Sequence, residues 1–196
     1  MRTRDENKEQ IVRQKAIEMI VQEGLDGFSM QKLAKASGVS PATLYIYYKD
    51  KDDLILKLGV EEGKRMSDAT LQGFNPDLPF AEGLRIQWHN RARFWLENPQ
   101  ANYCFEQLRH SAHRDKIHAS IQDNFAEIMG KFVKKAIQNG ELSPMPIEVY
   151  WSIAFAPLYN LIRFHNEGRS MGGKPFIFSE DIMNQTLALV LKALKP

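Results

Sequence analysis

The residues that carry the most chemical information lie between Ser29 and Lys51, where the sequence reads SMQKLAKASGVSPATLYIYYKDK. This stretch holds four lysines and one acid, Asp50, so its net charge is +3. Ammonium groups and the hydroxyls of serine, threonine and tyrosine can all bind phosphate oxygens, and hydroxyls also reach base edges. Two short helices around a turn at Gly38 would form a helix-turn-helix, which presents its second helix to the DNA major groove. The stretch therefore predicts a nucleic-acid interface.

Two short helices must position these residues. Ser29 stands where an N-cap is expected for a helix over residues 30–37, and Gly38 ends that helix because glycine accepts a positive φ. Ser40 followed by Pro41 repeats the start signal for a second helix over residues 41–48. Three apolar residues would join the two helices in a shared core: Leu33, Val39 and Leu44.

Apolar residues recur at intervals of three and four along almost the whole chain, and no window shows the alternation typical of a strand. The sequence therefore predicts an all-α protein with about nine helices. The expected helices span residues 5–23, 30–37, 41–48, 51–72, 80–97, 99–111, 114–139, 146–167 and 179–195. The clearest break is GFNPDLP at residues 73–79. Pro157 lies inside an expected helix, which it should kink or break.

The chain has 196 residues, a net charge of +2 and a single cysteine, Cys104. This length fits one compact unit or a small domain joined to a larger one, and it excludes a large multidomain protein. One cysteine forms no intrachain disulfide, so nothing requires an oxidising compartment. No signal-peptide pattern opens the chain, and the longest apolar stretch, residues 151–162, is too short to span a membrane. We expect a soluble, cytoplasmic protein that has no membrane partner.

Several residues of the first third agree in type and spacing with one known family. They are Gly24 to Ser29, Leu33–Ala34, Gly38–Val39–Ser40, Thr43–Leu44–Tyr45, Tyr47–Tyr48 and Lys49 to Leu54. Over about residues 5–58 the chain resembles the DNA-binding domain of the TetR family of bacterial transcriptional regulators. The resemblance implies a three-helix helix-turn-helix domain over residues 1–58. A larger helical domain over residues 59–196 would then bind an effector and dimerise.

The resemblance also implies which residues contact a double-stranded DNA operator. The helix over residues 41–48 would enter the major groove with Pro41, Ala42 and Thr43 toward base edges. The family's phosphate-contacting positions correspond to Tyr45, Tyr47 and Lys51. Two capping serines and one glutamine complete the expected set: Ser29, Ser40 and Gln31.

Other polar residues near this set have two readings. Lys32 and Lys35 either contact DNA or are simply solvated. Tyr48 follows Leu44 by four residues and is expected in the core rather than at the DNA. The basic residues of the N-terminal arm could add non-specific attraction to phosphate: Arg2, Arg4 and Lys8.

The family resemblance implies a homodimer that represses transcription from a palindromic operator. The last two expected helices carry wide apolar faces, and two such helices from each protomer could form a four-helix interface. The residues expected at this interface are Leu158, Ile162, Leu187, Val190, Leu191 and Leu194. The competing explanation is that these residues form the core of a single chain.

The C-terminal domain would release DNA when a small molecule binds. An aromatic and methionine lining suits an apolar or planar effector. The expected lining residues are Trp88, Trp95, Tyr103, Phe125, Met129, Trp151, Phe155 and Tyr159. The alternatives are that these residues are ordinary core, and that the protein is a dimeric DNA-binding regulator without any effector.

A histidine group offers one further alternative, a metal-dependent sensor or enzyme built on His110, His113 and His118. Cys104 or Asp115 could complete such a site. Arg109 and Arg114 flank the histidines and would repel a cation, so a solvated polar turn is favoured. The chain contains no familiar catalytic motif, and we expect no enzyme activity, no metal and no cofactor.

Overall fold

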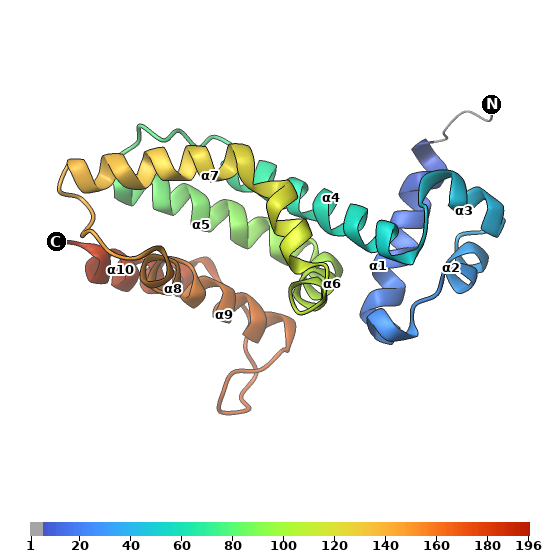
Figure 1. The fold of residues 1–196 in the computed structure, drawn as a ribbon. Coiled ribbons are helices and arrows are strands. Elements are labelled where there is room, and N and C mark those ends of the chain that lie inside the picture. Colours follow the sequence, from blue (N-terminus) through green and yellow to red (C-terminus); the bar gives the residue numbers. More distant parts are fainter. Residues whose placement is uncertain (1–5) are drawn as a thin grey trace. The chain divides into compact units, whose positions relative to one another are not determined.

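The computed structural model describes the backbone of residues 6–196 and the side chains of residues 7–121 and 125–196. Its regular elements within this range are all α-helices, so the prediction of an all-α fold is confirmed (Figure 1). The helices are α1 Glu6–Gly27, α2 Met30–Ala36, α3 Pro41–Tyr47, α4 Lys51–Leu71, α5 Phe80–Glu97, α6 Pro99–Arg109, α7 Arg114–Gln138, α8 Ile147–Ala154, α9 Ala156–Asn166 and α10 Glu180–Leu194.

Local sequence signals place most helix ends. The Ser179 hydroxyl accepts a hydrogen bond from the Ile182 amide at 3.3 Å and so caps α10. Pro99 stands in the first turn of α6, where a missing amide proton leaves no helical hydrogen bond unmade. Gly24 has a φ of 72° inside α1, so the regular part of that helix ends at Glu23, as the glycine predicted.

The helix expected over residues 146–167 is two helices. Phe155 leaves the helical conformation with a φ of −127°, which separates α8 from α9. Pro157 lies in the first turn of α9, so the expected break occurs two residues before the proline. This break accounts for ten helices in the described chain where nine were expected.

The chain divides into two compact units. Unit 1 comprises Met1–Arg65 and Asn98–Gln122, and unit 2 comprises Met66–Glu97 and Asp123–Pro196. Helices α4 and α7 each contribute residues to both units. The expected boundary at residue 58 therefore falls within α4, before the point at which the compact units divide.

In unit 1 the core joins the N-terminal helices to α6 and the first part of α7. Leu33, Leu44 and Ile20 are completely or almost completely buried there, together with Cys104 and Ile117. Burial raises the pKa of the Cys104 thiol to about 12, and the negative charge of Glu62 adds to this effect. Cys104 is therefore a protonated, apolar core residue.

Two glycines of α4 allow close contact with α7 within unit 1. A Cβ at Gly59 would clash with the Ile117 side chain, and one at Gly63 would lie 2.9 Å from Cγ1 of Ile121. Gly59 and Gly63 are four residues apart on α4, and Ile117 and Ile121 are four residues apart on α7. The two close contacts therefore lie one helical turn apart along the facing helices.

A buried carboxylate ties α1 to α4 in the same unit. Glu62 is 1% exposed, and its side chain accepts hydrogen bonds from Arg13 at 3.1 Å and from Arg65 at 2.7 Å. The two arginines offset the desolvation of this carboxylate.

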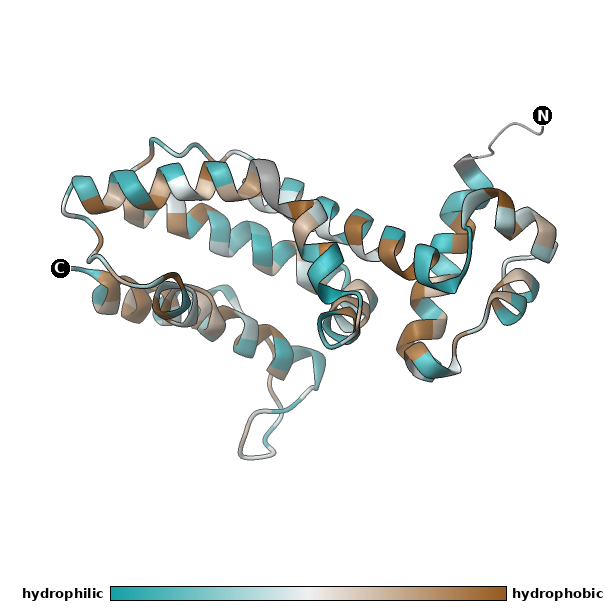
Figure 2. Ribbon diagram, viewed as in Figure 1, coloured by the Kyte–Doolittle hydropathy of each residue, from teal (hydrophilic) through white to brown (hydrophobic). Residues whose placement is uncertain are grey.

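Unit 2 packs α5 against α9 and α10, with α8 beside α9 and α10. Each helix in Figure 2 carries both hydrophilic and hydrophobic residues, as expected where one face is buried. The Trp88 indole donates to the Ala154 carbonyl at 2.8 Å, and the Phe80 and Phe132 rings stack 5.6 Å apart. These contacts fix α5 against α8 and α7 within the unit.

The residues expected at a dimer interface lie mainly inside unit 2. Leu158, Ile162, Leu187, Val190 and Leu194 are all at most 5% exposed within the single chain, and Leu191 is half-buried. This burial favours the competing explanation, a single-chain core, for the five residues, because the apolar faces of α9 and α10 pack against each other and against α5. Among the described residues no helix is long and apolar enough to cross a membrane.

Candidate nucleic-acid interface

The turn between α2 and α3 is closed by backbone hydrogen bonds that need a glycine. Gly38 has a φ of 66°, its amide donates to the Lys35 carbonyl, and the next amide, Val39, donates to the Ala34 carbonyl at 3.0 Å. A side chain at Gly38 would be strained in this conformation. The predicted turn residue thus sets the angle at which α3 leaves α2.

Serines cap both helices of the motif, as predicted. Ser29 accepts a hydrogen bond from the Lys32 amide at 3.2 Å, and Ser40 accepts one from the Thr43 amide at 3.1 Å. The hydroxyls of Ser40 and Thr43 also lie 2.8 Å apart. Both serine oxygens are therefore already engaged in helix starts, and any contact with phosphate adds to that role.

One face of α3 is free of protein contacts over most of its length. Pro41 and Ala42 are exposed, Thr43 is half-buried, and Tyr45 and Ile46 are 55% and 50% exposed. Large apolar side chains this exposed on a short, well-capped helix are typical of an interaction surface. The structure brings the predicted groove-facing residues together on this surface.

Ile46 is a member of this surface that the sequence reading missed. It follows Ala42 by four residues and Thr43 by three, so helical periodicity alone places it on their face. That spacing was the signal that could have identified it. An isoleucine there can contact thymine methyl groups.

Tyr47 differs from its expected role as a phosphate contact. Its side chain is only 6% exposed, beside the completely buried Leu44, and Tyr48 is 5% exposed as expected. Tyr47 instead helps to hold α3 on the core of unit 1, and its carbonyl accepts a hydrogen bond from Lys57 at 3.0 Å. Its position in the motif alone did not reveal that it faces inward.

The basic residues divide into those held by protein contacts and those that are not. Lys32 pairs with Glu23, and the Lys51 ammonium donates to the Leu25 carbonyl at 2.7 Å. Lys51 also lies 5.8 Å from the centre of the Phe28 ring, so it is half-buried in the unit 1 core. Lys35 and Lys49 are exposed and form no ion pair within the part of the chain that the structure describes.

The start of α4 is held by two aspartates. Asp50 accepts from the Asp53 amide at 2.8 Å, and Asp53 accepts from the Lys49 amide at 2.9 Å. The hydrogen bond from Lys57, supported by that from Lys49, holds the pKa of Asp53 below its usual value. The negative charges of both carboxylates interact favourably with the positive N-terminal end of the α4 dipole. The Lys49 ammonium remains exposed at this end of the motif.

Four further residues were named as candidate DNA contacts. Gln31 and Lys8 are exposed. Arg2 and Arg4 lie outside the described residues.

The residues of the histidine group lie apart from one another in the described part of the chain. Within the described side chains no three histidine, cysteine, aspartate or glutamate residues lie close enough to hold an ion. His113 Nε2 lies 3.3 Å from Asp52 Oδ1, whereas His110 and His118 are exposed. Cys104 is buried in its protonated form.

The predicted effector residues are only partly brought together. Tyr103 belongs to unit 1 and is 46% exposed, whereas the other seven belong to unit 2. Trp88, Trp95 and Phe155 are at most 3% exposed. Four of the seven contact an unexpected residue, Arg91. Its guanidinium lies 4.5 Å from the Phe155 ring, 5.4 Å from Trp151 and 5.7 Å from Phe125, and it donates a hydrogen bond to the Tyr159 hydroxyl at 2.7 Å.

Arg91 was missed because a charged residue is not expected in a core. It follows Gln87 by four residues and Trp88 by three, on the buried face of α5. This spacing was the available signal. Arg93, two residues further along α5, is exposed.

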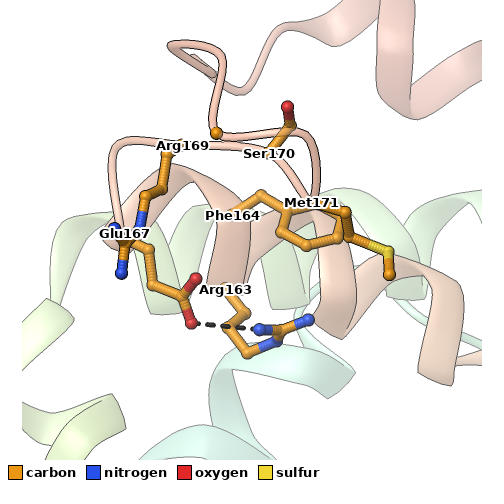
Figure 3. Close-up of a pocket in the computed structure, with 7 residues that line it drawn as sticks. Arg163, Phe164, Glu167, Arg169, Ser170 and Met171 are labelled. Atoms are coloured by element: carbon orange, nitrogen blue, oxygen red, sulfur yellow. Dashed lines mark hydrogen bonds and ion pairs between the residues drawn. The ribbon is translucent and has the colours of Figure 1, made fainter.

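The described residues also line surface pockets, of which one lies in each unit. The first, of about 290 Å³ in unit 2, is lined by Arg163, Phe164, Glu167, Arg169, Ser170, Met171 and Gly173. Figure 3 shows the Glu167 carboxylate reaching the Arg163 guanidinium across its floor, at 3.0 Å. The second, of about 530 Å³ in unit 1, includes Tyr103 and His110. Arg163 and Glu167 thus neutralise each other in the first pocket, whereas Arg169 forms no ion pair among the described side chains.

Comparisons with known proteins agree with this geometry. The family model described as "Bacterial regulatory proteins, tetR family" matches residues 7–58, which contain α2, α3 and most of α1. A second model, "Tetracyclin repressor-like, C-terminal domain", matches residues 79–187. Together they cover the helix-turn-helix and most of the remaining helices.

Individual relatives support both parts. A Haemophilus influenzae protein described as an uncharacterized HTH-type transcriptional regulator is 35% identical over 81 residues, which are 41% of this chain and 43% of that protein. The match thus spans less than half the length of that relative. The crystal structure of a TetR family transcription regulator from Marinobacter aquaeolei VT8 is 30% identical, with a TM-score of 0.86 over 100% of this chain and 99% of that one. A Vibrio parahaemolyticus structure, 24% identical with a TM-score of 0.80, covers 96% of this chain and 99% of its own and shares the fold.

Proposed function

This chain belongs to the TetR family of bacterial regulatory proteins and is a DNA-binding transcriptional regulator, and from that premise we propose that it is a repressor released by a small molecule. The family is a class of transcription regulators, not of enzymes. Its members bind DNA and are typically dimers. Here residues 1–58 act as the DNA-binding domain, and residues 59–196 act as the dimerisation and effector domain. The protein binds its DNA operator in the cytoplasm.

The exposed face of α3 is the observation that carries DNA recognition. Ala42, Tyr45 and Ile46 lie open on a helix whose start is capped by Ser40 and whose other face is buried. In the groove, Pro41, Ala42, Thr43 and Ile46 contact thymine methyl groups, and the Tyr45 hydroxyl reaches a phosphate. No arginine or asparagine stands on α3, so direct reading of guanine requires Gln31, Lys32 or Lys35 of α2, or an arginine of the N-terminal arm.

The phosphate contacts shift from the expected set. Lys35 and Lys49 supply uncommitted ammonium groups beside the motif, whereas Lys51 is already bonded to the Leu25 carbonyl. These charges provide sequence-independent affinity that falls with salt.

Homodimerisation uses the exposed face of α10. The core-facing residues of that helix are covered within the chain, which leaves an outward stripe at Gln185, Ala188, Leu189 and Lys192. Leu189 is 68% exposed at its centre. A two-fold dimer carries two copies of α3, and a palindromic operator offers them half-sites about 34 Å apart or at a multiple of that distance.

Release of DNA by the effector requires that the ligand bind more tightly to one dimer arrangement than to the other. In the favoured arrangement the separation of the two α3 helices does not match that of the half-sites. Its differential affinity for the two arrangements sets the effect, commonly about 1 to 3 kcal/mol. The cluster around Arg91 is the part of unit 2 best suited to hold it. A regulator without effector is the second candidate, favoured by the tight burial of Trp88, Trp95 and Phe155.

Selection of bound sites from random duplex DNA tests the proposal. The full chain should enrich a palindrome, and anisotropy should show binding of that site at least about 1,000-fold tighter than of random DNA. Recognition by α3 would be contradicted if no sequence were enriched. It would also be contradicted if the enriched sequence stayed the same after Ala42 and Ile46 were both changed to serine.

A further inference from the structure

Arg91 of α5 is a cation buried in the centre of unit 2. It is 0% exposed and is the only buried lysine or arginine among the described side chains. No acid pairs with it in that range. Its Nη1 donates to the Tyr159 hydroxyl at 2.7 Å, whereas its Nε and Nη2 are buried without a hydrogen-bond partner.

Such an arrangement is unfavourable for the chain alone. Arginine side chains carry a permanent positive charge in proteins, and the removal of such a charge from water without a neighbouring anion is strongly unfavourable. Aromatic faces recover part of that cost, because the negative face of each ring attracts the cation. Phe155, Trp151 and Phe125 play this role.

The aromatic contacts leave one edge of the guanidinium without a partner. Nε and Nη2 carry parallel N–H bonds on the same edge of the planar group. This edge matches the two oxygens of a carboxylate, which it binds through two parallel hydrogen bonds. The opposite edge is the one held by Tyr159.

Further buried polar atoms without partners lie in the same unit. Gln87, one helical turn before Arg91, has both amide atoms in this state, and so has the hydroxyl of Tyr150. Burial raises the pKa of Tyr150 while the charge of Arg91 opposes the increase, so the hydroxyl remains a proton donor near the guanidinium. Three side chains from α5 and α8 thus hold unused hydrogen-bonding capacity, which is rare in protein interiors.

We propose that Arg91, with Gln87 and Tyr150, binds the carboxylate of an organic acid whose apolar body lies against Trp151 and Phe125. The inference rests on the proposed function, because this acid is the effector of that function. A single buried cation neutralises a monoanion, which favours a carboxylate over a phosphate dianion. Trp151 is 41% exposed, so the aromatic surroundings of Arg91 extend to solvent.

Thermal unfolding of the full chain tests the chemistry without DNA. The probes are alkanoates of four to twelve carbons, benzoate, phenylacetate and indole-3-acetate, each compared with its neutral amide. At 100 times its Kd, an acid should raise Tm by several degrees, and its amide should not.

Three variants separate binding from folding. Arg91→Met should abolish the shift yet unfold no earlier than the wild type without ligand, because it removes an uncompensated charge. Arg91→Lys keeps the charge but loses the bidentate edge and should weaken acid binding at least about tenfold. Arg93→Met, at the exposed neighbouring position, should leave the shift unchanged.

The outcomes are distinct for the two proposals. Equal shifts by acids and amides, a shift that survives in Arg91→Met, or no shift by any acid would overturn the carboxylate site. Anisotropy with the selected palindrome is measured in the same samples. Acid binding that leaves DNA bound supports the site and contradicts release, whereas intact DNA binding without any acid shift contradicts the site alone.

Discussion

The hydroxyl oxygens of Ser40 and Thr43 lie 2.8 Å apart at the start of α3, and the same Ser40 oxygen accepts the Thr43 amide proton. This double contact fixes the Thr43 rotamer. With its hydroxyl turned toward Ser40, Thr43 presents its methyl group as the remaining contact for a base.

Recognition by Thr43 should therefore depend on its methyl group more than on its hydroxyl. Thr43→Val keeps the methyl group while replacing the hydroxyl, and should preserve the preferred operator, whereas Thr43→Ser should relax one position by about 1 kcal/mol or more. Site selection with each variant measures this. The reverse pattern, with valine altering the operator and serine preserving it, would show that the hydroxyl reads the base.

Lys35 and Lys49 should supply phosphate contacts. Lys35→Ala and Lys49→Ala should each weaken binding to all sequences and reduce the slope of log K against log salt by about 1. Anisotropy titrations at several salt concentrations give the slope. Lys134→Ala, an exposed lysine of α7 in unit 2, is the matched control and should change nothing. If a variant that carries both Lys35→Ala and Lys49→Ala keeps the salt slope of the wild type, these two lysines do not contact DNA phosphates.

The glycines of α4 should tolerate alanine less than a glycine of α7 does. Gly63→Ala places a Cβ against Ile121, and the resulting overpacking of about 1 to 3 kcal/mol outweighs the gain in helix propensity. Gly130→Ala meets nothing within 4 Å and should stabilise the protein by roughly 0.5 to 1 kcal/mol. Urea unfolding compares the two. Equal stabilisation by both changes would contradict a close contact at Gly63.

Cys104 should make stability fall at alkaline pH. The unfolded thiol ionises near about 8.5, whereas the folded thiol has its pKa raised to about 12. The stabilising effect is complete below the unfolded value and decreases by about 1.4 kcal/mol per pH unit between the two values. Unfolding curves from pH 7 to 10 measure it against Cys104→Ala, which lacks this contribution.

Thiol labelling gives an independent check of Cys104. The folded protein should resist a thiol reagent at pH 8 until urea unfolds unit 1. Rapid labelling of the native chain would show that Cys104 is accessible, contrary to its complete burial.

Leu189 should lie at the centre of the dimer interface. Leu189→Glu buries a carboxylate in an apolar contact and should shift the protein to monomers at micromolar concentration. Light scattering after size exclusion measures the mass. Met171→Glu, at an 89% exposed loop position, should leave the mass unchanged. A dimer that survives Leu189→Glu would exclude the α10 stripe.

Local signals predicted much of the fold. Serine caps, Gly38 and the Pro157 break act within one or two turns of chain, so their effects were visible in the sequence, and helix ends agreed within about two residues outside α1. The helix-turn-helix core of Leu33 and Leu44 followed from the same spacing.

Burial was harder to predict, because it depends on contacts between distant segments. Tyr47 and Lys51 occupy DNA-contact positions of the motif, yet one faces the core and the other bonds to α1. Leu187 and Ile162 gave no sign of whether their partner was the same chain or a second copy. Arg91 was not predicted for the same reason, since only the fold reveals that its guanidinium is buried with two nitrogen atoms lacking a hydrogen-bond partner.

The glycine pair of α4 also fixes the rotational phase of that helix. Each residue advances an α-helix by about 100°. One residue inserted between Asp50 and Gly59 would therefore rotate the two glycines by that angle about the helix axis, relative to the N-terminal cap. Bulkier side chains of α4 would then face Ile117 and Ile121. The packing of Gly59 and Gly63 against α7 therefore requires the present number of residues between the cap and Gly59.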